Sequence, residues 1–565
     1  MKPSAAEDVP CLPELHFDIN DSTPDIALSQ ECYKFSAKTL ATALSRGCNH
    51  RSIKTYVQRF PQAKINIAMD HHVKNHRVIT YAIDTGDAEI IHLLLQYNPN
   101  VDCTDFVNVP LLAFAIMRAL RVGRSNVEVI RLLLSHGADP RVIPEEMWRN
   151  YMKTPTNIAE RVSGEVPEPE KWCTEKYRLT LAKTLDLTTR YYLWRASRIR
   201  TPKQRMLRIA GAHNMTALLK LPYQIIGQEL AVKLVVETIY AHVAQDTEKP
   251  LVMAFSGLSG HGKTELATQM GSLLSIPITE LDCTHSNSQT ALLGSTYGYS
   301  GNTHGAPLNN FLVENRGSRC VVFLDEFDKT GQDVWNALLK VMDTGTYRDR
   351  REGRDQTEIN CRKVIWILAC NYGDSTISKF HAKHLATCKN GDVGEVSLKS
   401  LQEELEELFM SRFSAAVTGR IDEIVPFIPF NKGEQAVVAH KFLLAFQDEA
   451  KRPIDEGAKK LVGNADVRIV EDGKVCELIA RRSYKKELGA RSIYKGVRGL
   501  RRAFTLQYSD TDQLVTDSTS GKDPEKYVIQ LNPLTEDQEE ISIFREEADE
   551  QVDEPNRWSW DLPVH

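Results

Sequence analysis

One short stretch of the chain carries the residues best suited to chemistry. Residues 257–264 read Gly-Leu-Ser-Gly-His-Gly-Lys-Thr and fit the pattern G-x-x-x-x-G-K-[ST]. An apolar run, 251–255, comes directly before them, and a segment of good helix formers, 265–270, follows. A strand, a glycine loop and a helix in this order are the setting in which this pattern binds a nucleoside triphosphate. A glycine turn that ends in an isolated lysine is the alternative interpretation.

The residue types in this loop suit the binding of ATP and Mg²⁺. Glycines let successive backbone N–H groups face phosphate oxygens, and the helix that follows presents its positive dipole end. We expect Lys263 to reach the terminal phosphates and the Thr264 hydroxyl to bind Mg²⁺. The ATP-binding residues expected here are Gly257, Ser259, Gly260, His261, Gly262, Lys263, Thr264 and Glu265.

Two carboxylates follow a second apolar run, residues 320–324. A buried strand that ends in Asp325 and Glu326 would place both at the carboxyl edge of a parallel sheet, where open α/β folds bind ligands. Asp325 is expected to hold Mg²⁺. Glu326 is expected to polarise the water that attacks the γ-phosphate. The alternative is an acidic cap after an ordinary core strand.

Composition excludes several classes of protein. With 565 residues, of which 42% are apolar and 26% charged, the chain is typical of soluble proteins with about three to four domains. A net charge of −5 indicates no general nucleic-acid footprint. No apolar run approaches the ~20 residues that span a bilayer. The acid-rich first thirty residues fit neither a transit peptide nor a secretory signal, and the odd number of scattered cysteines, 11, fits reduced thiols, so we expect a cytoplasmic protein.

The chain divides into parts of different composition. We expect a multidomain protein in which an all-α solenoid precedes an α/β P-loop domain and a small, mostly helical C-terminal domain. The expected parts are a loose tail (1–34), helical repeats (35–145), a basic helical connector (146–222), a large ATPase domain (223–430), a smaller domain (431–540) and an acidic tail (541–565).

The expected repeats resemble ankyrin repeats. Residues 79–102 and 112–140 share a leucine triplet and a polar turn, and the two triplets lie 39 residues apart. The ankyrin period is about 33 residues, so we expect an insertion near 118–125 and a degenerate first repeat at 39–66. A small generic helical domain is the alternative.

Two further clusters favour plain structural roles. The stretch 190–200 mixes basic and aromatic residues, which is conceivable for a nucleic-acid or membrane surface, but a solvated linker helix with an apolar inner face is the favoured interpretation. His381, His384 and Cys388 have the spacing of metal ligands but no fourth partner. We therefore expect an insertion helix there and no zinc.

Several segments around the two ATP motifs resemble Clp-type AAA+ proteins. Residues 224–229 are similar to the box that precedes the P-loop in that family, which implies that Ile225 and Ile226 pack against adenine. The run 364–370 ends in Asn371, as the strand of sensor 1 does. An asparagine there holds the lytic water without adding a charge that would repel the phosphates. An ordinary helix entry at 224–229 is the alternative.

Two arginines match nucleotide-contacting arginines of the family. Arg420 lies where the resemblance implies an arginine finger that reaches the ATP of a neighbouring subunit, although Gly419 replaces the usual asparagine. Arg491, in a Gly-Ala-Arg segment, matches sensor 2, which contacts phosphates in its own subunit. The expected catalytic group is thus Lys263, Glu326, Asn371 and Arg420. A surface ion pair for Arg420 and a helix-start arginine for Arg491 are the alternatives.

A short aromatic loop is similar to the substrate-gripping pore loop of the family. Residues 298–301 read Gly-Tyr-Ser-Gly, where the family has Gly-Tyr-Val-Gly. Tyr299 would grip an extended peptide, and Tyr297 is a secondary candidate. An ordinary glycine–tyrosine turn is the alternative.

Taken together, the chain resembles ankyrin-repeat Clp-type AAA+ disaggregases, the single-ring type best known from animal mitochondria. The resemblance implies an ATP-dependent unfoldase or disaggregase that forms a homo-oligomer, a hexamer in the family. Unfolded or aggregated polypeptides would be its clients, an adaptor would bind the repeats, and a mitochondrial location becomes the alternative to the cytoplasm. No Ile-Gly-Phe-like tripeptide is present, so we expect no peptidase partner. A binding scaffold with a nucleotide-gated switch and a remodeller of one dedicated complex remain open as alternatives.

Overall fold

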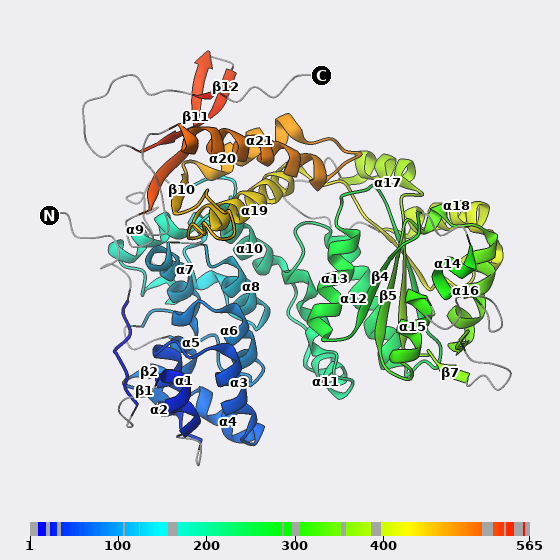
Figure 1. Ribbon diagram of the computed structural model, residues 1–565, viewed down its shortest axis with the longest axis horizontal. Helices are drawn as coiled ribbons and strands as arrows, with labels where there is room; N and C mark the ends of the chain where they lie inside the picture. The colour runs from blue at the N-terminus through cyan, green and yellow to red at the C-terminus, as the bar shows by residue number, and fades with distance from the viewer. Residues whose placement is uncertain are drawn as a thin grey trace. The chain divides into compact units, whose positions relative to one another are not determined.

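The computed structural model divides the chain into two compact units (Figure 1). Unit 1 comprises Met1–Ile199, Ala439–Leu478 and Val497–His565, and unit 2 comprises Arg200–Val438 and Ile479–Gly496. The residues described are 10–17, 23–30, 35–104, 108–123, 125–155, 168–284, 288–295, 306–351, 358–385, 397–510, 524–535, 538–546 and 558–559. None of the described helices is long and apolar enough to cross a bilayer.

The N-terminal part of unit 1 is built from short helices. These are α1 (Pro24–Gln30), α2 (Ala37–Ser45), α3 (His50–Gln58), α4 (Gln62–Met69), α5 (Val78–Thr85), α6 (Ala88–Leu95), α7 (Leu111–Val122) and α8 (Val127–Ser135), with a small hairpin of β1 (His72–Val73) and β2 (His76–Arg77). Polar caps define their ends. Asn49 accepts the Ser52 N–H at the start of α3, and Asp87 accepts the Ile90 N–H at the start of α6.

These helices stack in two rows (Figure 1). The row α2, α5 and α7 has each helix packed on the next, and so does the row α3, α6 and α8. The insertion expected near 118–125 corresponds to a longer helix, because α7 has 12 residues where α5 has 8. Stacked helix pairs bury a continuous apolar core that a single pair cannot bury alone.

Within the expected connector, residues 175–198 continue this stack, which corrects our interpretation of residues 190–200. Helix α9 (Glu175–Thr184) packs on α7, and α10 (Leu187–Arg198) packs on α8. We expected a solvated linker helix, but Arg190, Tyr191 and Leu193 are each 0% exposed. The basic residues of this stretch suggested exposure to solvent, because the buried partner of Arg190 lies far along the chain.

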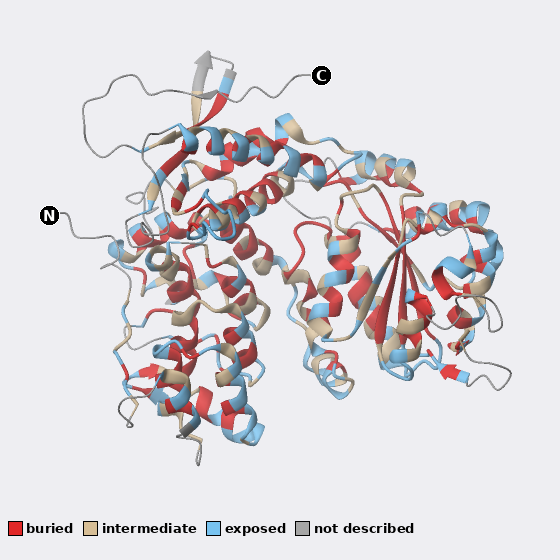
Figure 2. Cartoon of the chain, in the orientation of Figure 1, coloured by how far each residue is buried: buried red, intermediate tan, exposed pale blue. Residues whose placement is uncertain are grey.

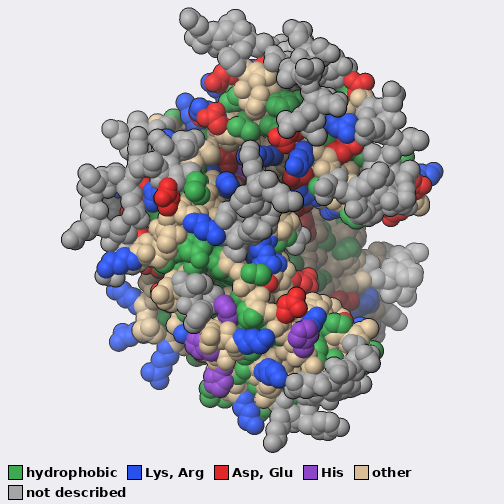
Figure 3. All heavy atoms as spheres, turned by 90° about the vertical axis from the view of Figure 1, so that its left-hand side faces the viewer, with side chains coloured by type: hydrophobic (Ala, Val, Ile, Leu, Met, Phe, Trp, Pro, Cys, Tyr) green, Lys and Arg blue, Asp and Glu red, His purple; other side chains and the backbone are tan. Residues whose placement is uncertain are grey.

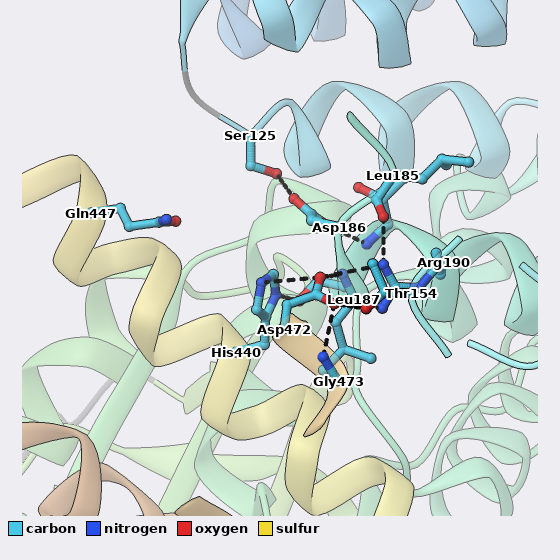
Figure 4. Close-up of polar contacts among 12 residues, drawn as sticks. Ser125, Thr154, Leu185, Asp186, Leu187, Arg190, His440, Gln447, Asp472 and Gly473 are labelled. Carbon is cyan, nitrogen blue, oxygen red and sulfur yellow. Dashed lines mark hydrogen bonds and ion pairs between the residues drawn. The ribbon is translucent and has the colours of Figure 1, made fainter. Parts of the chain in front are cut away.

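That partner is Asp472, the first residue of α20 (Figure 4). Its carboxylate accepts from Arg190 Nη2 at 2.8 Å, from the Leu187 N–H at 2.6 Å and from the Thr154 hydroxyl at 3.0 Å. Burial alone would raise the pKa of Asp472, but the Arg190 charge and these hydrogen bonds hold it below its usual value. The buried charge pair is therefore fully supplied with partners.

Two neighbours complete this cluster. His440 lies beside Asp472 (Figure 4), with its Nε2 4.0 Å from that carboxylate. Its Nδ1 lies 2.7 Å from the Thr188 hydroxyl, and burial lowers the pKa of His440. Gly473 follows Asp472, and a Cβ atom there would lie 2.0 Å from the Met152 carbonyl oxygen. Only glycine allows the start of α20 to approach this backbone so closely.

The C-terminal part of unit 1 combines helices with a four-stranded sheet. Helices α19 (Lys432–Ala450), α20 (Asp472–Ser483) and α21 (Ala490–Ser509) each have residues in both units. The strands are β10 (Ala465–Ile469), β11 (Glu525–Thr535), β12 (Gln538–Arg545) and β13 (Trp558–Ser559), with β10 and β11 parallel and the other neighbours antiparallel.

Part of the acidic tail expected from residue 541 is in fact strand. Ile541 and Ile543 lie in β12, pair with Leu531 and Ile529 of β11, and are buried. The alternation of apolar and polar residues in this stretch is typical of a half-buried strand. Its high content of acids outweighed that signal in our prediction.

The surface of unit 1 is mixed in character. On the face in Figure 3, basic, acidic and apolar side chains of the described residues are interspersed.

Unit 2 contains a five-stranded parallel sheet in the order β4-β5-β8-β3-β9. The strands are β4 (Ile278–Asp282), β5 (Cys320–Asp325), β8 (Val364–Cys370), β3 (Leu251–Ser256) and β9 (Glu423–Pro426). Every residue of β3 and β8 is buried, as the red central strands in Figure 2 show. Strands buried on both faces read as continuous apolar runs, which is how the sequence marks them.

Helices cover both faces of this sheet. On one face Met253 and Ile367 pack with residues of α12 (Glu229–Ala244) and α13 (Lys263–Leu274). On the other, Trp366 packs with residues of α15 (Pro307–Glu314), α16 (Gln332–Thr344) and α18 (Lys399–Thr418). The remaining elements are α11 (Gln204–Ala212), α14 (Gln289–Leu293), β6 (Thr346–Arg348), β7 (Glu358–Asn360) and α17 (Asp374–Phe380).

The buried ion pair of unit 1 makes a testable prediction. Asp472→Ala is expected to lower the free energy of opening of α10 by about 3–5 kcal/mol, because it leaves the Arg190 charge buried without its carboxylate. Residue-resolved hydrogen exchange on the full chain measures this loss. The control is Asp466→Ala, whose surface pair with Lys451 spans 2.7 Å and whose effect should stay below about 1 kcal/mol. Equal losses in the two variants would contradict the interpretation.

Candidate nucleotide site

The carboxyl ends of three neighbouring strands converge on one site in unit 2. The glycine loop follows β3, Asn371 follows β8, and Asp325 ends β5. Strand β8 lies between β3 and β5 in the sheet, so the asparagine is flanked by the loop and the carboxylates. This is the edge of an open parallel sheet at which ligands bind.

The loop adopts a backbone that depends on its first glycine. Gly257 has a φ of +143°, and a Cβ atom there would lie 2.6 Å from the Phe427 carbonyl oxygen. Gly262 forms the N-cap of α13 with a φ of 93°, so Lys263 and Thr264 begin the helix. The loop therefore ends at a helix N-terminus, which favours a bound anion.

Lys263 is buried and held by oxygen atoms. Its Nζ donates to the Gly257 carbonyl at 2.5 Å and to Asn371 Oδ1 at 3.0 Å. Burial lowers the pKa of Lys263, while the nearby carboxylates Asp325 and Glu326 oppose that shift. The ammonium is thus placed among groups that a phosphate oxygen can supplement or replace.

Asn371 joins the lysine to the predicted catalytic carboxylate. Its Nδ2 donates to Glu326 Oε1 at 3.0 Å, while its Oδ1 accepts from Lys263. Sequence reasoning missed Asp328, whose Oδ1 accepts the Asn371 N–H at 3.3 Å. The acid at the end of the Asp-Glu-Phe-Asp sequence was the available signal for it.

Glu326 has an unusual backbone conformation. Its φ is 54°, in the left-handed region, and its N–H donates to Asp325 Oδ1 at 3.0 Å. Such conformations cost on the order of 1 kcal/mol or more for residues other than glycine and cluster at functional sites. The turn separates the two carboxylates, so that Glu326 contacts Asn371 while Asp325 stays at the end of its strand.

The residues present fit a nucleotide with Mg²⁺. Thr264 and Asp325 supply the hard oxygen ligands that Mg²⁺ prefers, and Lys263 supplies a positive charge. Ile225 and Ile226 are both buried, and Ile225 belongs to the core beside α12. Their contact with adenine stays a prediction. Glu265, on α13, accepts from Gln269 at 3.3 Å.

The predicted sensor 2 arginine and the predicted arginine finger have different surroundings. Arg491 Nη1 donates to Ser259 Oγ of the loop at 2.9 Å. Arg420 instead donates to the Ala416 carbonyl at 2.5 Å and lies 3.5 Å from the Asp343 carboxylate. Within the described chain, its hydrogen bonds and ion pairs include none to the glycine loop or to Glu326.

The predicted pore-loop residues Tyr297 and Tyr299 lie outside the described residues. The described flanks of 296–305 are tied together. Arg350 Nη1 donates to the Gly294 carbonyl at 3.1 Å, and the Arg350 N–H donates to Asn309 Oδ1 at 3.1 Å. Asn309 is fully buried and also donates to Asp349 Oδ1 at 2.9 Å.

The cluster with the spacing of metal ligands is described only in part. Of its members, Cys388 lies outside the described residues, and His381 and His384 belong to a single helical turn after α17. Across the described residues, no group of three or more His, Cys, Asp or Glu side chains has a metal-binding arrangement.

Comparison with known proteins identifies the segment that carries the site. Residues 248–424 match the family model described as "AAA domain (Cdc48 subfamily)", and residues 209–275 match the model described as "Torsin". Curated proteins named "Chaperone protein ClpB" are similar too. Those of Chlamydia caviae and Chlamydia pneumoniae are each 30% identical, over 241 and 240 residues.

This segment is similar to AAA domains and to the corresponding part of ClpB chaperones. The matches cover 41% of this chain and only 26% of each of the two chlamydial proteins, so the chain spans about a quarter of their length. The ClpB of Malacoplasma penetrans is 28% identical over 306 residues, 52% of this chain and 38% of that protein.

Among solved structures, one titled "Closed State CryoEM Reconstruction of Hsp104:ATPyS and FITC casein" is similar to this chain. It has 17% sequence identity and a TM-score of 0.43, and the match covers 90% of this chain and 69% of that one.

The site predicts a specific loss of nucleotide binding. Lys263→Ala should weaken ATP binding about 10- to 100-fold, because it removes charge-assisted hydrogen bonds to phosphate. Isothermal titration of the full chain with ATP and Mg²⁺ measures the Kd. The control is Lys340→Ala on the exposed face of α16, which should bind as the parent chain does. An unchanged Kd for Lys263→Ala would contradict this assignment of the site.

Proposed function

We propose that this protein is an ATP-driven protein unfoldase or disaggregase, an ATPase that works as a homo-oligomeric ring, with six subunits as in the resembled family. The observation that carries the proposal is the continuous link from Lys263 through Asn371 to Glu326. It joins the phosphate loop to a carboxylate able to act on water. The similarity of the AAA+ domain to ClpB chaperones supports the choice of substrate class.

Each residue of the site would have a separate role in the hydrolysis of ATP. Lys263 and Mg²⁺, held by Thr264 and Asp325, would stabilise the charge that spreads over the transferred phosphoryl group. Glu326 would take a proton from the attacking water, and Asn371 would orient both. Such positioning and electrostatic stabilisation supply most of the catalysis in phosphoryl transfer.

Arg420 is proposed to complete the site of a neighbouring subunit. Its described contacts are with Ala416 and Asp343 and not with the phosphate loop of its own chain. An arginine supplied in trans requires a head-to-tail contact, and such contacts close into a ring when the rotation allows it. Hydrolysis would then depend on assembly.

Tyr299 is proposed to grip the client polypeptide inside this ring, with Tyr297 beside it. The bonds of Arg350 to Gly294 and Asn309 would give the loop a firm base on both sides. The stacked helices of unit 1, proposed here to be ankyrin repeats, would bind an adaptor or a client. A cytoplasmic location remains part of the proposal.

The scaffold alternative differs in one measurable respect. If the helices only select a partner and the ATPase is a switch, Glu326→Gln, which should bind ATP without hydrolysing it, would still recover aggregated clients. If the protein threads its clients, recovery in this variant is lost, because each step of translocation needs hydrolysis.

The shared site predicts complementation between two inactive variants. Arg420→Ala and Glu326→Gln should each lower kcat by at least about 100-fold. Mixed at equal concentration, they should regain about a quarter of the parent ATPase rate, because one interface in four combines an intact Glu326 with an intact neighbouring Arg420. Phosphate release measures the rate, and Glu407→Gln, at an exposed position of α18, serves as the control. A mixture that stays inactive would show that Arg420 does not act in trans.

The pore loop predicts a separation of ATPase activity from unfolding. Tyr299→Ala should keep ATP hydrolysis within about twofold and abolish the unfolding of a fluorescent client protein, because it removes the aromatic grip alone. Tyr299→Phe keeps the ring and should unfold the client at the parent rate. Unfolding that continues in Tyr299→Ala would refute this role.

A further inference from the structure

The phosphate loop is joined to a second segment of unit 2 by three contacts. That segment is the turn between α20 and α21, residues 484–489, together with the first two residues of α21. The Ala490 N–H donates to the Gly260 carbonyl at 2.9 Å, and Arg491 donates to Ser259 at 2.9 Å. The third contact, between His261 Nε2 and the Tyr484 hydroxyl, spans 3.1 Å.

The two backbones approach as closely as glycines permit. A Cβ atom on Gly260 would lie 2.2 Å from the Leu488 carbonyl oxygen, and one on Gly489 would lie 2.4 Å from the Gly260 carbonyl oxygen. Both glycines also have positive φ values, +73° and +52°. Any larger residue at either position would separate the loop from the turn.

The His261 side chain belongs to this contact. It is fully buried, stacks on Phe430 with ring centroids 5.2 Å apart, and its Nδ1 lies 3.0 Å from the Ser259 carbonyl oxygen. Burial lowers the pKa of His261 to about 4, so the ring is neutral near pH 7. With Nδ1 donating to Ser259, Nε2 is the acceptor and the Tyr484 O–H donates to it.

We propose that His261 and Tyr484 are positioning residues that latch the phosphate loop to the turn before α21 and so slow the release of ADP. This proposal rests on the ATPase function proposed above and assigns it two residues outside the reacting groups. Opening the site would have to break the His261–Tyr484 hydrogen bond. The same movement would carry Arg491 away from Ser259, because Arg491 follows the turn directly. Interactions lost on opening act on the dissociation rate more than on the association rate.

The test measures the release of a fluorescent ADP, N-methylanthraniloyl-ADP, from the full chain after a chase with excess ATP. Tyr484→Phe removes one hydroxyl and should speed release about fivefold, the effect of one lost hydrogen bond, with an association rate within about twofold of the parent. Tyr494→Phe, on an exposed position of α21, is the matched control and should release at the parent rate.

Substitutions of His261 test whether the two residues act together. His261→Leu should speed release as Tyr484→Phe does, and the double variant should be no faster than His261→Leu alone. His261→Gln keeps a side-chain acceptor for Tyr484 and should preserve slow release. This rescue would not follow from a purely structural role, which any change of shape would disturb.

Each outcome decides a separate question. Unchanged release in Tyr484→Phe, or effects of the two single variants that multiply, would overturn the latch while leaving the ATPase proposal intact. A parent chain that binds no ADP at all would overturn the ATPase proposal and the latch with it.

Discussion

The candidate site depends on one constraint, the burial of the positive charge of Lys263. A buried ammonium must be surrounded by oxygen atoms. In this parallel sheet, residues at the ends of adjacent strands supply these atoms. The loop after β3 supplies the Gly257 carbonyl, and Asn371 after β8 supplies its amide oxygen. The carboxylates at the end of β5 lie one strand further along. Strand order, helix positions and the left-handed turn at Glu326 all serve this arrangement.

Much of this arrangement could be predicted because its signals are local. A buried parallel strand reads as an apolar run that ends at the binding edge, so Asp325 and Glu326 follow from their place in the sequence. Asn371 follows from the resemblance of its strand to sensor 1. The helix ends of unit 1 are equally local, since a cap such as Asn49 lies within three residues of the group it binds. The structure also follows the expected α/β order of strand and helix in unit 2.

The features that escaped prediction are contacts between distant parts of the chain. Arg190 lies in a basic stretch and was expected to be solvated, because no residue near it in the sequence indicates that Asp472 is its partner. The side chain of His261 looked like one more residue facing phosphate, yet its partner Tyr484 is 223 residues away. The acids of β12 outweighed its apolar–polar alternation, and its pairing with β11 shows that it is a strand and not part of a tail. Local patterns identify elements and motifs, whereas the partners of buried polar groups require the folded chain.

The distance between Arg190 and Asp472 also has a consequence for the synthesis of the protein. The two residues are 282 positions apart. At the usual pace of translation, about 5–20 residues each second, Arg190 is made roughly 15–60 s before the residue that neutralises it. Throughout that interval the newly made helices carry the guanidinium of Arg190, which is buried in the folded protein, without its counterion. We therefore expect α10 to reach its final packing only after Asp472 has been synthesised, because an unpaired buried charge is costly.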